Sequence, residues 1–371
     1  MTPRPNPRRN VLKMSQTEEA RTPETTEPEH GERRLGFGAL FSRHVISARY
    51  ADGVWSGTEL LDFDDLRMSP AAMVMHYGQA IFEGLKAFRA DQRTVLIFRA
   101  ADCATRFDRS ATRMGMPPLP PGLFVDAVTR LISADAAEVP SSPGSAIYIR
   151  PVMFADEPSL AVRPSTEFRF LVLASPVDSF FASGRTMIDA YAQRSHIRAA
   201  LGGTGDVKCA GNYAGAMAAK TEAMSRGCDE VLWLDAVEHR FLEEFGAMNC
   251  FVVQGSGASA ELITPPLTGT ILPGHTRATV INLAQRRGIA VREAPIALDE
   301  VLDPDGMISE VFACGTAAGV APVRTIVTDA GRTRTFGHRP GPITAGLAAD
   351  YTALVHGALA AEPDWIIRIE G

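Results

Sequence analysis

Lysine is scarce in this chain, and one lysine stands where an amine nucleophile would be useful. Of the 37 basic side chains only Lys13, Lys86, Lys208 and Lys220 are lysines, which leaves 33 arginines. Arginine can replace lysine as a simple positive charge but not as an amine nucleophile, so the remaining lysines are enriched in that role. Lys208 ends a glycine-rich loop in GDVKCAGNY and precedes Tyr213 by five residues. A solvated surface lysine is the alternative, and Lys220 is better interpreted that way, on the solvated face of a helix.

Two turns of small residues and one arginine are suited to holding an anion. LPGHTR (272–277) places a Pro-Gly turn and a threonine at the start of a predicted helix, where free backbone N–H groups and the helix dipole attract phosphate. ACGTAAG (313–319) is a second such turn, with the Thr316 hydroxyl beside exposed N–H groups. Arg99 closes the apolar run TVLIF. Taken singly, these signals also fit a capped helix, a tight loop and a solvated arginine.

Acidic and aromatic residues complete the candidate chemistry. Glu243 and Glu244 precede FGAMN, and one buried carboxylate beside a ring nitrogen would keep that nitrogen protonated, although paired acids in a turn are usually solvated. YIRP (148–151) alternates a phenol with a guanidinium, as a carboxylate clamp or as simple strand packing. The eight histidines include no HxH or HxxxH pair, so we expect no metal site. Together, an imine-forming lysine, two anion-binding turns, an arginine, a tyrosine and an acid describe a pyridoxal phosphate site.

The elements that must position these residues alternate between short apolar runs and helical spacing, which is typical of a mixed α/β fold. Apolar runs predict strands within residues 45–55, 94–100, 145–154, 168–177, 230–236 and 248–255. Helical spacing predicts helices within residues 101–114, 123–137, 212–226 and 276–287. The third of these helices places Ala214, Met217, Ala218 and Met224 on one face.

We expect four segments along the chain. Residues 1–34 are rich in Pro, Thr, Glu and Arg, which predicts a disordered tail without a targeting signal and leaves Met14 open as an alternative start. Residues 35–177 form a small N-terminal α/β domain, the weakly periodic residues 178–205 an interdomain loop and linker, and residues 206–371 a large C-terminal domain.

Composition limits the class of protein and its partners. The formal charge of −6 gives no basic surface for nucleic acid, and the absence of an apolar run of about 18 residues argues against a membrane span. We therefore expect a soluble protein with small-molecule substrates. Five scattered cysteines without a CxxC pair indicate neither disulfides nor a zinc site, which favours a reducing, cytoplasmic setting.

Six motifs in order give the chain a strong resemblance to one enzyme family. They are HYGQAIFEGLKAF (76–88), YIRPVMFADEPSLAV (148–162), KCAGNY (208–213), EVLWLDAVEHRFLEEFGAMN (230–249), LPGHTR (272–277) and CGTAAGVAPV (314–323). From about residue 37 to residue 367 the sequence resembles the branched-chain amino acid aminotransferases among the fold-type IV pyridoxal phosphate enzymes. The resemblance implies two mixed α/β domains joined by an interdomain loop, with the cofactor between them and held by the C-terminal domain.

The resemblance also assigns the cofactor contacts. Lys208 matches the lysine that binds the cofactor aldehyde and then moves the proton between Cα and the cofactor. Glu244, but not Glu243, matches the acid paired with the ring nitrogen, and Tyr213 matches the phenol at the cofactor oxygen O3′. The phosphate contacts match Arg99, the backbone of His275, Thr276 and Thr316.

Substrate contacts are carried over in the same way. Tyr148, Thr316 and the backbone of Ala317 and Ala318 would receive the α-carboxylate, and Arg150 and Lys86 the distal carboxylate of glutamate. The walls of the apolar pocket match Tyr77, Phe82, Tyr148, Val162 and Phe180, with Val162 supplied by the partner subunit of a homodimer or higher homo-oligomer.

Three departures from the family concern substrate range more than reaction type. Phe180 stands where many members have tyrosine, Ala247 where the animal members have threonine, and the CxxC pair of the animal members is missing. These departures predict a missing hydroxyl contact from the interdomain loop, a looser site and no thiol regulation of that kind.

The resemblance implies transamination between L-leucine, L-isoleucine or L-valine and 2-oxoglutarate, giving branched-chain 2-oxo acids and L-glutamate. It leaves open the physiological direction, the preference among the three amino acids and the assembly beyond a dimer. Alternatives are another fold-type IV enzyme, namely a D-amino acid or (R)-amine transaminase or aminodeoxychorismate lyase, and a non-catalytic regulatory relative.

Overall fold

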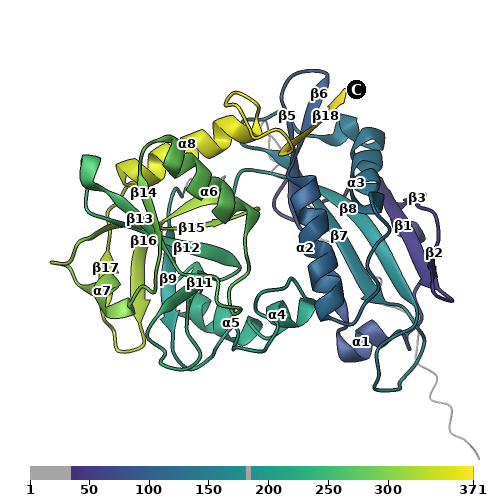
Figure 1. Ribbon diagram of the computed structural model, residues 1–371, viewed down its shortest axis with the longest axis horizontal. Helices are drawn as coiled ribbons and strands as arrows, with labels where there is room; N and C mark the ends of the chain where they lie inside the picture. Colours follow the sequence, from purple (N-terminus) through teal and green to yellow (C-terminus); the bar gives the residue numbers. More distant parts are fainter. Residues whose placement is uncertain (1–34, 181–184, 371) are drawn as a thin grey trace, which may run out of the picture. The chain divides into compact units, whose positions relative to one another are not determined.

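The computed structural model describes residues 35–180 and 185–370, whose strands form two nine-stranded sheets (Figure 1). The first sheet is antiparallel, in the order β18-β6-β5-β7-β8-β1-β2, with β3 paired to β1 and β4 to β7. Its strands are β1 (His44–Ala51), β2 (Val54–Trp55), β3 (Glu59–Asp62), β4 (Ala80–Phe82), β5 (Leu85–Arg89), β6 (Thr94–Phe98), β7 (Ala146–Ala155), β8 (Phe168–Val177) and β18 (Ile366–Glu370).

The helices that follow β6 cover the first sheet. α2 (Ala100–Arg113) buries Cys103, Phe107 and Ala111, four residues apart, because this spacing lines up one face of a helix. Phe107 packs against Phe124 of α3 (Leu123–Ala134) and Phe170 of β8. Each such fully buried side chain contributes about 1.5–3 kcal/mol to stability. The remaining short helices of this part are η1 (Phe63–Asp65), α1 (Met73–Tyr77) and η2 (Ala136–Glu138).

The second sheet is mixed and partly closed on itself. Its order is β11-β10-β9-β16-β15-β12-β13-β14, with β17 paired to β16, and β11 also pairs with β12. Six strands therefore close into a ring, in which β9 runs parallel to both β10 and β16. The strands are β9 (Ile188–Gln193), β10 (Glu230–Leu234), β11 (Leu242–Phe245), β12 (Met248–Gln254), β13 (Glu261–Thr264), β14 (Ala290–Glu293), β15 (Ile308–Gly315), β16 (Gly319–Thr328) and β17 (Thr333–Thr335).

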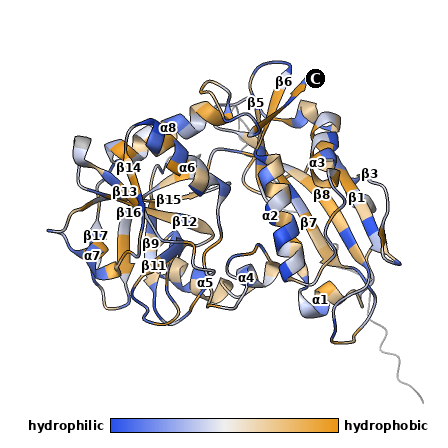
Figure 2. Cartoon of the chain, viewed as in Figure 1, coloured by the Kyte–Doolittle hydropathy of each residue, from blue (hydrophilic) through white to orange (hydrophobic). Residues whose placement is uncertain are grey.

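Helices of the second half surround this ring. α6 and α8 pack on each other and on β15, and α5 packs on β9 and β10. Figure 2 shows apolar residues concentrated in the strands of both sheets. None of the helices within residues 35–180 and 185–370 combines the length and the apolar character needed to cross a membrane. The helices are α4 (Ala210–Ala214), α5 (Met217–Ser225), η3 (Gly257–Ser259), α6 (His275–Arg286), α7 (Leu298–Leu302) and α8 (Pro342–Val355).

The structure corrects the prediction of one helix within residues 212–226. Two short helices, α4 and α5, replace it, because Gly215 lowers helix propensity at the junction. The predicted face is also wrong: Met217 and Met224 are exposed, and Ala219 and Ala223 are buried against β9 and β10. Only small side chains fit there.

Two strands lie where the sequence predicted otherwise. β9 lies inside residues 178–205, which the sequence analysis treated as loop and linker, and it forms part of the ring. β18 belongs to the first sheet, where it pairs with β6, although it follows the second half of the chain (Figure 1). The four domain boundaries remain predictions. The predicted tail at 1–34 and residues 181–184 of the predicted loop lie outside the described residues.

Candidate active site

Lys208 is held next to β4 by backbone contacts. The Phe82 N–H donates to the Lys208 carbonyl at 3.0 Å, and the Lys208 N–H donates to the Ser110 hydroxyl of α2 at 3.1 Å. The amine donates to the Tyr213 hydroxyl at 2.7 Å and lies 5.0 Å from the centre of the Phe82 ring. The Lys208 amine and the Tyr213 phenol are therefore within hydrogen-bond distance of each other.

Charges around Lys208 determine its protonation. Burial lowers the pKa of the amine, but Tyr213 and Glu83 raise it by more, so the pKa lies above the ordinary value of lysine. The amine is thus an ammonium near neutral pH and must lose a proton before it can attack a carbonyl carbon. The Tyr213 hydroxyl oxygen accepts a hydrogen bond from this amine and orients it.

Glu244 of β11 is a buried carboxylate with fixed partners. Its Oε2 lies 3.1 Å from Nε of Arg198, while its Oε1 accepts from the Leu272 N–H at 3.0 Å and from the Asn249 amide at 3.3 Å. Burial raises the pKa of Glu244 above its ordinary value, and Arg198 opposes that effect. Glu243 points elsewhere, because successive strand residues face opposite sides, and accepts a hydrogen bond from Thr270.

A cavity of about 740 Å³, including space open to solvent, brings Glu244 and Tyr213 to one wall. Arg198, Leu272 and Ala247 also line this cavity. Lys220 also lines this cavity and is not simply solvated as predicted, because its amine contacts the carboxylate of Glu230. An aromatic ring placed here would meet a buried acid, a phenol and an aliphatic side chain.

The LPGHTR turn leads into α6, as predicted. α6 begins at His275 after Gly274, and no side chain caps its first turn. Gly274 is required, because a Cβ there would lie 2.0 Å from the Asn249 side-chain oxygen. Burial, with Arg106 and Arg99 nearby, lowers the pKa of His275 to about 2, so its imidazole is neutral. The first N–H groups of α6, including that of Thr276, remain free to bind an anion.

Arg99 faces this turn from the end of β6. Its Nη1 donates to the His275 carbonyl at 3.0 Å and to the Thr279 hydroxyl at 2.9 Å, and its Nε donates to Asp102 at 2.6 Å. Arg99, His275, Thr276 and Thr316 all line one small cavity. The structure therefore brings together the four residues predicted for the phosphate.

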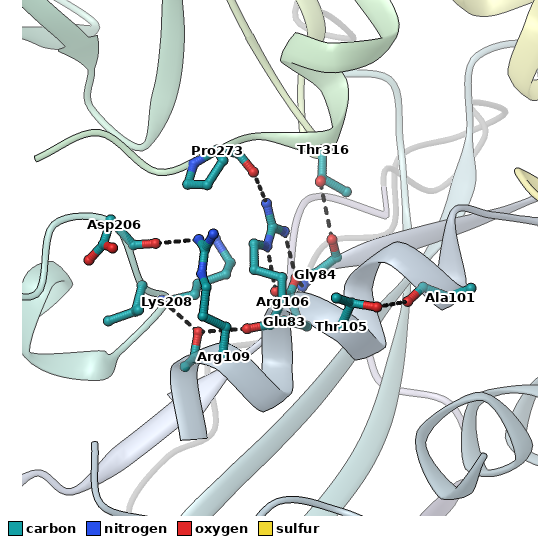
Figure 3. A network of polar contacts seen from close by, with 12 residues as sticks. Glu83, Gly84, Ala101, Thr105, Arg106, Arg109, Asp206, Lys208, Pro273 and Thr316 are labelled. Carbon is teal, nitrogen blue, oxygen red and sulfur yellow. Dashed lines mark hydrogen bonds and ion pairs between the residues drawn. The ribbon is translucent and has the colours of Figure 1, made fainter. Parts of the chain in front are cut away.

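Arg106 and Glu83 form a buried ion pair that the sequence analysis missed. Figure 3 shows Arg106 between Glu83 and Pro273. Arg106 makes two hydrogen bonds of 2.7 Å to the Glu83 carboxylate and one of 3.1 Å to the Pro273 carbonyl. The pair joins the turn between β4 and β5 to the loop that begins α6. A charged residue on the buried face of a predicted helix was the available signal.

Side chains of β5 and β7 meet the second small-residue turn. Arg150 Nη2 donates to the Tyr148 hydroxyl at 2.9 Å, and Lys86 donates to the Ala317 carbonyl at 2.7 Å. The Thr316 hydroxyl donates to the Gly84 carbonyl at 3.1 Å (Figure 3). A Cβ on Gly84 would lie 2.0 Å from the Tyr148 hydroxyl, so only glycine allows this approach. Burial lowers the pKa of Lys86 to about 8.

Phe82 links the two groups of residues. Its ring packs edge-on to Tyr213 at 4.7 Å, and the Arg150 guanidinium lies 4.5 Å from the ring centre. Phe180 lines a further cavity together with Lys86, Thr316, Ala317 and Ala318. Most of the predicted substrate contacts thus lie in one contiguous region.

Tyr77 and Val162 do not line the cavities described above. The Tyr77 hydroxyl donates to the Leu160 carbonyl at 2.5 Å, and 44% of Tyr77 is exposed. Val162 is 87% exposed. Among the described residues, no hydrogen bond or ring contact joins either of them to Lys208.

Comparisons with known proteins agree with this arrangement. Residues 80–326 match the family described as amino-transferase class IV. The chain is 42% identical to the branched-chain-amino-acid aminotransferase of Mycobacterium tuberculosis H37Rv, covering 91% of this chain and 93% of that protein. It is also 42% identical to branched-chain-amino-acid transaminase 1 of Bacillus subtilis, over 78% and 81% of the two chains. The crystal structure of the branched-chain aminotransferase of Thermoproteus uzoniensis with norvaline superposes with a TM-score of 0.73 at 27% identity, covering 88% and 99%.

Proposed function

Because the chain belongs to the class IV amino-transferases, we propose that it catalyses pyridoxal phosphate-dependent transamination between branched-chain L-amino acids and 2-oxoglutarate. The products are branched-chain 2-oxo acids and L-glutamate. One observation carries the proposal: the Lys208 amine is hydrogen-bonded to the Tyr213 phenol, which lines one cavity together with the buried Glu244 carboxylate and Leu272 of the anion-binding turn. These are the groups that an aldehyde, a ring oxygen, a ring nitrogen and a phosphate require.

The donor set fits the cofactor. Lys208 would bind the aldehyde carbon, Tyr213 the ring hydroxyl and Glu244 the ring nitrogen. Arg99, the first N–H groups of α6 at His275 and Thr276, and Thr316 would hold the phosphate, because the uncapped helix start and the guanidinium both favour an anion. Bound pyridoxal phosphate supplies an electron sink for the negative charge that develops at the substrate Cα.

The chain's own residues control the protons of the reaction. Lys208 Nζ takes the Cα proton and returns it in the reverse direction, as a general base and then a general acid. Tyr213 Oη, 2.7 Å away, accepts a hydrogen bond from the amine and orients it toward Phe82. Arg198 Nε lies 3.1 Å from Glu244 and favours the ionised form of this buried carboxylate. An ionised Glu244 would keep the ring nitrogen of the bound cofactor protonated.

One pocket must accept both an apolar side chain and a carboxylate. Phe82 and Tyr148 would supply apolar surface, while the Tyr148 hydroxyl, Thr316 and the Ala317 to Ala318 backbone would receive the α-carboxylate. Lys86, which is buried, and Arg150 would pair with the distal carboxylate of glutamate or 2-oxoglutarate. Phe180 would cover the pocket from its open side.

The exposed apolar residues support assembly as a homodimer. Val162 is 87% exposed and Leu160 64% exposed, and Tyr77 lies beside them. A partner subunit would cover this surface, and each subunit would bring its Val162 to the substrate pocket of its neighbour. Val162→Asp is expected to yield monomers with weakened L-leucine binding, and an unchanged mass by light scattering would contradict this assembly. All five cysteines are buried and unpaired, which supports a cytoplasmic setting.

The test is the visible absorption spectrum of the purified protein. We expect a cofactor band that is lost on adding L-leucine and returns with 2-oxoglutarate. A band that responds to D-alanine but not to L-leucine would reject the proposed substrate class, and no band after adding pyridoxal phosphate would reject the enzyme assignment.

A further inference from the structure

Trp365, which precedes the last strand, packs against Arg99, the arginine proposed to bind the cofactor phosphate. Arg99 directly follows β6, and Trp365 directly precedes β18, which pairs with β6. The Arg99 N–H donates to the Trp365 carbonyl at 2.6 Å. The Arg99 guanidinium lies 4.3 Å from the centre of the Trp365 ring. These contacts connect two segments more than 260 residues apart in the sequence.

Trp365 completes the fixation of Arg99. Asp102 holds Nε, and His275 and Thr279 hold Nη1. The Trp365 face restrains the whole plane of the guanidinium, which a single hydrogen bond cannot do. Among the described residues, Nη2 has no hydrogen-bond acceptor, so this nitrogen is left for a ligand.

The backbone of Arg99 also depends on this contact. Arg99 has φ of 58°, in the left-handed region that non-glycine residues rarely adopt. The hydrogen bond from its N–H to Trp365 is made in that conformation. Such strain persists where surrounding contacts impose it, and it is common at ligand-binding positions.

We propose that Trp365 is a positioning residue for the cofactor phosphate: it holds Arg99 in its binding conformation, so the segment before β18 sets cofactor affinity. The proposal rests on the phosphate-binding role proposed above for Arg99. The Trp365 ring also meets Phe98 edge-on at 6.1 Å, but its effect on the cofactor runs through Arg99, so it affects ligands with a phosphate and not the same ligand without one.

The experiment compares pyridoxal phosphate with pyridoxal, which lacks the phosphate, as ligands of the full chain freed of cofactor. Trp365→Leu keeps an apolar side chain but removes the aromatic ring that faces the Arg99 guanidinium. Trp365→Phe keeps an aromatic ring there, although a smaller one. We expect Trp365→Leu to weaken pyridoxal phosphate binding about 5- to 30-fold. Trp365→Phe should lose less than about threefold, and both should bind pyridoxal as the unchanged protein does. Trp55→Ala, a tryptophan change in β2 next to Tyr50, should alter neither affinity.

Arg99→Gln and the double variant separate the two proposals. Arg99→Gln should weaken pyridoxal phosphate selectively, and adding Trp365→Leu to it should cost nothing further, because both act through one guanidinium. If Arg99→Gln weakens both ligands equally, the phosphate role of Arg99 is wrong, and the role of Trp365 with it. If Arg99→Gln is selective but Trp365→Leu weakens both ligands equally, weakens neither, or adds its full effect in the double variant, Trp365 is only a packing residue.

Discussion

Nε of Arg198 lies 3.1 Å from Oε2 of Glu244, and 7% and 3% of the two side chains are exposed. Burial raises the pKa of Glu244, and Arg198 opposes that rise. Removal of Arg198 would leave the carboxylate buried without a counter-charge, which raises its pKa further. Arg198 is therefore a positioning residue for the proposed acid.

Arg198→Met should shift the pH dependence of kcat. Glu244 must be ionised to hold the proton on the ring nitrogen. If its pKa is raised, the carboxylate becomes protonated at a higher pH than before as the pH is lowered. The acid limb of the kcat profile should move upward by about one pH unit or more. The measurement is kcat for L-leucine from pH 5 to 10. Arg194→Met, at an exposed arginine of the same segment, is the control and should leave the profile in place. A profile that does not move in Arg198→Met contradicts the role.

Lys208→Ala should abolish turnover. The variant lacks both the amine that binds the aldehyde and the group that moves the Cα proton, so we expect kcat to fall by at least about 10⁴-fold. The cofactor absorption band should change while the thermal unfolding temperature stays close to that of the unchanged protein. Residual activity within tenfold of the original would refute the assignment of Lys208.

Lys86 should make binding of the dicarboxylate sensitive to pH. Burial lowers the pKa of Lys86 from that of an ordinary lysine to about 8, so the amine loses its charge as pH rises through that value. KM for 2-oxoglutarate should therefore rise between pH 7.5 and 9.5, while KM for branched-chain 2-oxo acids changes little. In Lys86→Met, KM for 2-oxoglutarate should be about tenfold higher and independent of pH over this range. Parallel pH profiles for the two substrates would exclude a role for this amine at the distal carboxylate.

Glu83→Gln should destabilise the fold strongly. The Glu83 side chain is fully buried and pairs with Arg106, of which 7% is exposed. Removing one charge leaves the other buried without compensation, which typically costs about 3–5 kcal/mol. The free energy of unfolding can be measured with urea. Asp62→Asn removes a carboxylate from an ion pair with Arg43 in which both side chains are mostly exposed, and it should cost at most about 1 kcal/mol. If both variants lost the same free energy of unfolding, burial of the ion pair would not determine the cost of removing one carboxylate.

Residues whose roles depend on nearby sequence could be predicted. Lys208 and Tyr213, five residues apart, do form a pair, and LPGHTR does begin a helix. The family assignment and the mixed fold are confirmed by the comparisons. The separate roles of the site residues remain predictions.

Contacts between distant segments could not be predicted. Arg198 and Glu244 are 46 residues apart, and arginine is so abundant here that no single one stands out. β9 is buried along its whole length and lacks the alternation that marks a half-exposed strand. The break between α4 and α5 within residues 212–226 depends on Gly215, whose effect on helix propensity is small compared with tertiary packing.

Because β18 pairs with β6, the first sheet can be completed only after the last residues of the chain have been synthesised. β6 is made early, yet its second neighbour consists of residues 366–370. While the ribosome adds the intervening residues, one side of β6 presents unpaired N–H and C=O groups. At 5–20 residues per second, this interval lasts on the order of ten to fifty seconds. The nascent chain therefore leaves this edge of β6 unpaired for most of its translation.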